Sequence, residues 1–222
     1  MSGQQPDSGA VQAGMDGPAR QAAFLSALVT EHFVLQSAAS TTVSEAAGRS
    51  TLYLSVLSSS LVALGFAAQS PGMFAPFAAT VLPAVFVLGV FTVARLVDTG
   101  VQNLTFLAGI ARIRGYYRTL VPEASEYFAP WGQIEQDQAA EALASLARRR
   151  SLLTGLGTSA SMVAWVNSIV AGVGVALLCV RALGQDDMVI AVLVGLAAGL
   201  IWLTGFYAYQ SYRYRIFQPP RP

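Results

Sequence analysis

The stretch "SASMVAWVNSIVAGVGVALLCV", residues 159–180, contains no Asp, Glu, Lys, Arg or His. A bilayer is crossed by about 20 consecutive, mostly apolar residues, so this stretch is long enough to be a transmembrane helix. Three other stretches have the same character, and the only charged residue in them is Arg95, one turn from an end. They are residues 50–69, 77–97 and 188–209. The sequence therefore predicts four transmembrane helices.

The composition of the whole chain agrees with this prediction. Of 222 residues, 54% are hydrophobic and only 11% are charged, whereas soluble domains carry about 25% charged residues. The net charge of +1 provides no strong field for binding nucleic acid. The single cysteine, Cys179, lies inside an apolar stretch and has no intrachain disulfide partner. We expect an all-α, polytopic membrane protein with long cytoplasmic helical extensions.

The arginines predict the orientation. In "ASLARRRSLLTGLG", residues 144–157, the triplet Arg148, Arg149 and Arg150 comes directly before the third apolar stretch. Basic residues close to membrane spans stay cytoplasmic. All basic residues are arginines, and with four spans every one except Arg181 falls on the same side. We therefore expect a multi-pass protein of the bacterial cytoplasmic membrane, with both termini in the cytoplasm.

The parts between the spans look helical. Phe106, Ile110 and Ile113 follow each other at helical spacing, and Asn103 is a candidate N-cap. The second and third spans are expected to continue inward as long helices. The predicted organisation is a disordered cytoplasmic tail (1–18), a cytoplasmic or interfacial helix (19–48), a first transmembrane pair (49–98), a cytoplasmic helical hairpin (99–150), a second transmembrane pair (151–210) and a cytoplasmic tail (211–222).

No catalytic or metal-binding pattern is recognisable. Metal sites need several His, Cys or carboxylate ligands in one place, and this chain has one histidine, His32, which we expect to be solvated. Nucleophile motifs and phosphate-binding loops are also missing. We therefore expect no enzymatic activity and no cofactor. The spans have no internal Asp, Glu or His, which argues against ion-coupled transport.

Small residues are the clearest feature of the spans. In the third span they recur every four residues, at Ala160, Ala164, Ser168, Gly172 and Ala176. Gly195 and Gly199 have GxxxG spacing in the fourth span, and such residues let helix backbones approach closely in a membrane. Ser55, Ser58 and Ser59 share one face of the first span. Asn167 either forms a hydrogen bond between helices or lines a water path.

Two functions are compatible with this pattern. The leading one is an oligomerising scaffold or partner subunit without catalysis. Its partners would be the lipid bilayer and either a second copy of the chain or another membrane protein. The alternative is a pore-forming or channel-like protein, in which Asn167 and the Ser55/Ser59 face line a water path.

Residues 30–64, "TEHFVLQSAASTTVSEAAGRSTLYLSVLSSSLVAL", resemble uncharacterised small four-span integral membrane proteins of actinobacteria. The similarity extends through "ARIRGYYRTLVPEASEYF", residues 111–128. In layout alone, a cytoplasmic helix leading into spans is similar to the membrane effectors of nucleotide-signalled defence systems. These resemblances imply a helical membrane protein and carry over no functional residue.

Overall fold

The computed structural model describes residues 17–70, 72–124, 158–183 and 188–216. These residues form the long helices α2 (Gly17–Ala67), α3 (Phe74–Tyr117), α6 (Ser159–Leu183) and α7 (Met188–Ile216), and within them there is no strand. Each of the four helices is long and apolar enough to cross a membrane. For the described residues, the prediction of an all-α protein with four such helices is therefore confirmed.

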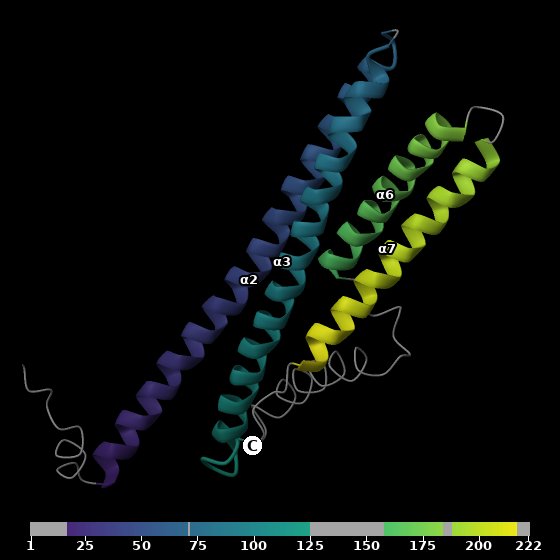
Figure 1. Cartoon of the computed structure of the whole chain (residues 1–222). Coiled ribbons are helices and arrows are strands. Elements are labelled where there is room, and N and C mark those ends of the chain that lie inside the picture. The colour runs from purple at the N-terminus through teal and green to yellow at the C-terminus, as the bar shows by residue number, and fades with distance from the viewer. Residues whose placement is uncertain (1–16, 71, 125–157, 184–187, 217–222) are drawn as a thin grey trace, which may run out of the picture.

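The helices form two antiparallel hairpins. α2 lies along α3, and α6 lies along α7 (Figure 1). The second hairpin packs against α3 mainly through α6. It covers only the part of α3 that is close to the turn between α2 and α3, so the other ends of α2 and α3 extend beyond it (Figure 1).

α2 runs across residues 48 and 49, where the sequence analysis divided a cytoplasmic or interfacial helix from the first transmembrane pair. Residues 17–67 form one uninterrupted helix. Proline breaks helices, and in this segment it occurs only in the first turn, at Pro18, and after the end, at Pro71. The internal Gly48 lowers helix propensity by only about 1 kcal/mol. At 1.5 Å per residue the helix is about 76 Å long, more than twice the roughly 30 Å thickness of a bilayer's hydrocarbon core.

α3 is continuous as well. It passes through Pro83 and ends at Tyr117, before Pro122. The prediction that Asn103 caps the start of a helix is wrong, because Asn103 lies in the interior of α3. Its side-chain oxygen instead accepts a hydrogen bond of 3.1 Å from the Thr42 hydroxyl of α2. This contact joins the two helices on the part of the hairpin that extends beyond α6 and α7.

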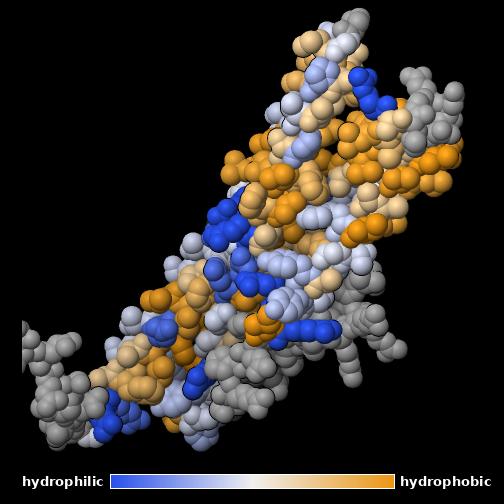
Figure 2. All heavy atoms as spheres, viewed as in Figure 1, coloured by the Kyte–Doolittle hydropathy of each residue, from blue (hydrophilic) through white to orange (hydrophobic). Residues whose placement is uncertain are grey.

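The core lies where the two hairpins meet. Its fully buried side chains include Tyr53 of α2, Val97 of α3 and Val163 of α6. Figure 2 shows apolar residues concentrated over the half of the molecule that contains α6 and α7, and more hydrophilic residues over the extended half. The second part of the predicted hairpin of residues 99–150, from residue 125 onward and including Arg148, Arg149 and Arg150, lies outside the described residues.

Candidate functional site

Asn167 of α6 is fully buried between helices. Its side-chain Oδ1 accepts a hydrogen bond of 3.2 Å from the hydroxyl of Tyr53 on α2, which is itself 1% exposed. Hydrogen bonds between helices in a membrane contribute about 0.6–2 kcal/mol. The amide nitrogen Nδ2 is buried and has no hydrogen-bond partner in the described part of the chain. Asn167 thus joins the second hairpin to α2 and is not in contact with the molecular surface.

Gly89 of α3 provides the space for this amide. A Cβ built on Gly89 would overlap the side chain of Asn167, and would lie only 2.9 Å from its Nδ2. Real Cβ atoms essentially never approach a neighbour within 3.0 Å. Any larger residue at this position would therefore displace either the amide or the helix. Tyr53, Gly89 and Asn167 bring three of the four helices together at one polar contact.

α6 and α7 meet through a second set of close contacts, at glycine. A Cβ on Gly172 would lie 2.9 Å from the carbonyl oxygen of Gly195, and one on Gly199 would lie 2.8 Å from that of Ser168. Since these neighbours are backbone atoms, they cannot move aside as a flexible side chain would. The structure therefore brings Ser168, Gly172, Gly195 and Gly199 together at the line of closest approach between the two helices.

Charged residues cluster at the level where α7 ends. Arg213 of α7 forms an ion pair with Asp98 of α3. On α2, Glu45 pairs with Arg49 at 2.7 Å and lies 3.9 Å from Arg95 of α3. Between this level and the turn that joins α2 to α3, Arg181 is the only charged residue in the described part of the chain. The ion pairs thus mark one end of the apolar half of the molecule.

A line of small side chains runs along the outside of α2. Its residues follow each other at alternating steps of 3 and 4, the spacing with which left-handed helix pairs meet. All are exposed, and except for two valines all are Ala, Gly, Ser or Thr. They are Ala23, Ala27, Thr30, Val34, Ser37, Thr41, Ser44, Gly48, Thr51, Ser55, Ser58, Val62 and Gly65. We call this line the outer face of α2.

The centre of the outer face is opposite the side of α2 that packs in the bundle, although Val34, Ser37 and Thr41 also border a shallow groove against Gln102 and Phe106 of α3. At 100° per residue, its centre lies on the far side of the helix from the buried residues Tyr53, Leu57 and Leu64. Ser59 lies beside the face, and its hydroxyl donates a hydrogen bond of 2.9 Å to the carbonyl oxygen of Ser55. Local bonds of this kind satisfy a serine without a second helix.

The predicted site residues therefore fall in separate places. Asn167 is fully buried, whereas Ser55 and Ser59 are exposed on α2, so no single surface contains all three. His32 differs from the expectation that it is solvated, because it is half-buried, with its ring centroid 6.4 Å from that of Tyr117. Among the described residues, no group of three His, Cys, Asp or Glu side chains is arranged to hold a metal ion.

Sequence reasoning missed Tyr53 and Gly89 as partners of Asn167. The pattern contained a partial signal, because a strongly polar side chain inside an apolar helix needs a polar partner on another helix. A lone glycine inside an apolar helix, such as Gly89, also often marks a close approach. Which tyrosine and which glycine meet Asn167 depends on the alignment of three helices, and one sequence does not contain that information.

Comparison with known proteins identifies no relative of this chain. No protein family, no curated protein sequence and no solved structure matches the chain.

Proposed function

We propose that this chain is an oligomerising scaffold or partner subunit of the bacterial cytoplasmic membrane, without catalytic activity. The observation that carries the proposal is the outer face of α2, an exposed line of small residues. Lipid tails are as apolar as leucine, so helices in a membrane associate mainly through close packing, and small residues permit it. A line of small side chains that stays exposed among the described residues is therefore suited to a second helix.

Two glycines support this interpretation. A Cβ on Gly48 or Gly65 would meet nothing within 4 Å, whereas one on Gly172 would overlap the backbone of α7. The chain thus uses glycine for close helix packing inside the molecule, and has the same residue type in open space on α2. From Ala23 to Gly65 the outer face is about 63 Å long at 1.5 Å per residue.

The length of α2 points to contact outside the membrane as well. The helix continues for several turns beyond the ion pairs of Glu45, together with the far end of α3. Because the arginines favour the cytoplasmic side for this end, we infer that the extension enters the cytoplasm. A second copy of α2, packed along the outer face, would then continue the contact from the membrane into the cytoplasm.

Cysteine cross-linking tests the proposal in native membranes. Cys179→Ser removes the single native cysteine, and Ser55→Cys or Ser58→Cys then places a thiol on the outer face. Mild oxidation should join two copies into a disulfide-linked dimer at these positions. Thr204→Cys is the matched control, because Thr204 is exposed on α7 with its hydroxyl bonded to the Leu200 carbonyl oxygen, and it should stay monomeric.

Leucine substitutions complete the test. Gly48→Leu and Ser55→Leu add bulk to the outer face and should reduce the oligomer fraction in mild detergent, while Thr204→Leu should not. Equal cross-linking at Ser55 and Thr204, with no effect of the leucine variants, would show that the outer face of α2 faces lipid and would refute the proposal.

The hydroxyl groups of the outer face support a second candidate, a pore between copies. Ser44, Thr51, Ser55 and Ser58 are exposed along one side of α2, and a ring of copies with this side inward would surround a polar path. Asn167, being buried inside each copy, would not belong to that path. Ion flux through liposomes that contain the purified protein, reduced by Ser55→Leu, would favour the pore over the scaffold.

A further inference from the structure

The second hairpin leaves an open groove against α3. The groove has a volume of about 860 Å³ and lies between the first half of α3 and the second half of α6. Its wall is almost entirely apolar and includes Ala78, Leu82 and Phe86 of α3 and Val170, Gly174 and Leu178 of α6. Ligand sites in proteins measure about 300–1,000 Å³, so this groove has the volume of a binding site.

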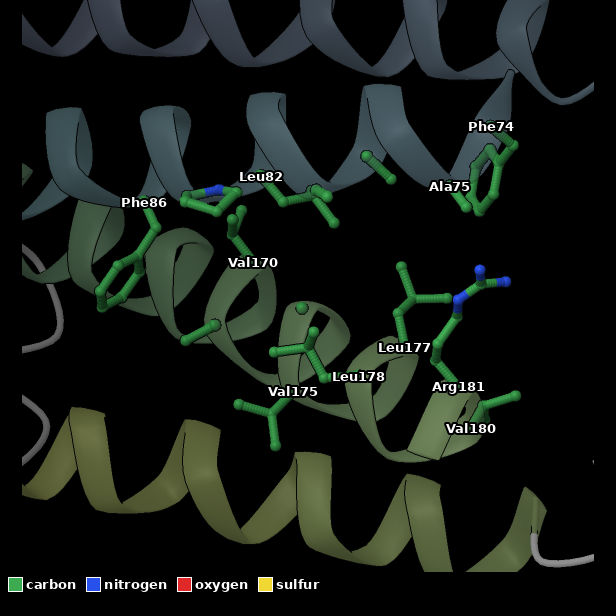
Figure 3. Close-up of a pocket in the computed structure, with 15 residues that line it drawn as sticks. Phe74, Ala75, Leu82, Phe86, Val170, Val175, Leu177, Leu178, Val180 and Arg181 are labelled. Carbon is green, nitrogen blue, oxygen red and sulfur yellow. The ribbon is translucent and has the colours of Figure 1, made fainter. Parts of the chain in front are cut away.

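One charged side chain lies at the groove. Arg181, in the last turn of α6, lines the end where α3 begins at Phe74. In Figure 3 its guanidinium lies on the same side of the groove as Phe74, while Val170 and Phe86 line the opposite end. Arg181 is exposed, and its side chain has no ion pair or hydrogen bond within the part of the chain that the structure describes.

We propose that this groove binds an anionic diacyl phospholipid, with an acyl chain between α3 and α6 and the phosphate on Arg181. The proposal rests on insertion of the four helices in a membrane and is independent of oligomerisation. An apolar groove that opens sideways into a bilayer is accessible to acyl chains. Arginine holds phosphate with two parallel N–H···O bonds, and this one lies near the end of an apolar helix, where phosphate groups are found.

The groove has a position where it can be filled without disturbing the bundle. A Cβ on Gly174 would meet nothing within 4 Å, although Gly174 lines the groove. Gly174→Leu therefore places a side chain where the acyl chain would lie. Gly205 of α7 is also exposed with nothing within 4 Å of a Cβ, and it does not line the groove. Gly205→Leu is therefore the matched control.

The test measures lipid retention. The protein is reconstituted in nanodiscs with equal amounts of phosphatidylglycerol and phosphatidylcholine, extracted in mild detergent, and examined by native mass spectrometry. The wild type should retain phosphatidylglycerol over phosphatidylcholine, because the choline cation of phosphatidylcholine compensates the phosphate charge and weakens its attraction to Arg181. Arg181→Gln should reduce the retention of phosphatidylglycerol by about tenfold or more, the effect of losing a hydrogen bond to a charged group. The preference over phosphatidylcholine should fall with it. Gly174→Leu should lose the bound lipid, and Gly205→Leu should retain it.

Arg181→Gln keeps the proposal testable if Gly174→Leu fails to fold, because Arg181 is exposed and not part of the core. Arg181 also lies at a helix C-terminus, where a positive charge favours the helix. That role would change thermal stability but not the choice between the two lipids. Equal retention of both lipids by the wild type, unchanged preference in Arg181→Gln, unchanged binding in Gly174→Leu, or displacement by inorganic phosphate alone would each overturn the proposal.

Discussion

At the scale of single residues, the contact between Gly89 and Asn167 makes a sharp prediction. Gly89→Ala should destabilise the protein by about 1–3 kcal/mol, because the new Cβ overlaps the buried amide. In an Asn167→Ala background the amide is gone, so the same Gly89→Ala change should cost much less. A double-mutant cycle of unfolding free energies in detergent measures this coupling.

Gly205→Ala is the control for this cycle, since a Cβ there meets nothing within 4 Å. It should have the same small effect in both backgrounds. Costs of Gly89→Ala and Asn167→Ala that simply add would mean that the two residues do not touch.

Tyr53→Phe should also destabilise the fold, by about 1–3 kcal/mol, because it leaves the buried Oδ1 of Asn167 without its donor.

At the scale of elements, α6 and α7 should depend on their glycines. Gly172→Leu or Gly199→Leu forces two backbones apart, because each Cβ would lie within 3.0 Å of a carbonyl oxygen of the partner helix. We expect a loss of about 1–3 kcal/mol and a lower thermal midpoint in detergent. Gly205→Leu, on the open side of α7, should leave the midpoint unchanged. Equal midpoints for all three variants would show that this interface does not stabilise the hairpin.

At the scale of the whole molecule, the ends of the hairpins should lie on opposite sides of the membrane. In a Cys179→Ser background, Ser70→Cys near the turn between α2 and α3 should react with an impermeant thiol reagent in intact cells. Gln36→Cys, on the far part of α2, should react only after the cells are opened. Both positions are exposed. Labelling of Gln36→Cys in sealed cells would reverse the proposed orientation.

The sequence by itself determined the helical class and the apolar half of the molecule. Four stretches are long, apolar and almost free of charge. Segments of this kind form helices in a membrane, because a helix satisfies all of its own backbone hydrogen-bonding groups. The small residues of α6 and α7 could also be recognised in the sequence, because GxxxG spacing follows directly from the helical repeat. These features are local, and a local pattern is readable from one chain.

The tertiary structure decided which residues of the other helices each helix contacts. The sequence did not show that the residues on either side of Gly48 belong to one helix, whereas α2 runs from Gly17 to Ala67 along α3. Asn103 looked like a helix cap and is instead bonded to Thr42 of another helix. The alternative prediction placed Asn167 and Ser55 on one water path, whereas in the structure Asn167 is buried and Ser55 is exposed on α2. Such outcomes depend on the rotation of each helix about its axis, which is set by contacts between segments far apart in the chain.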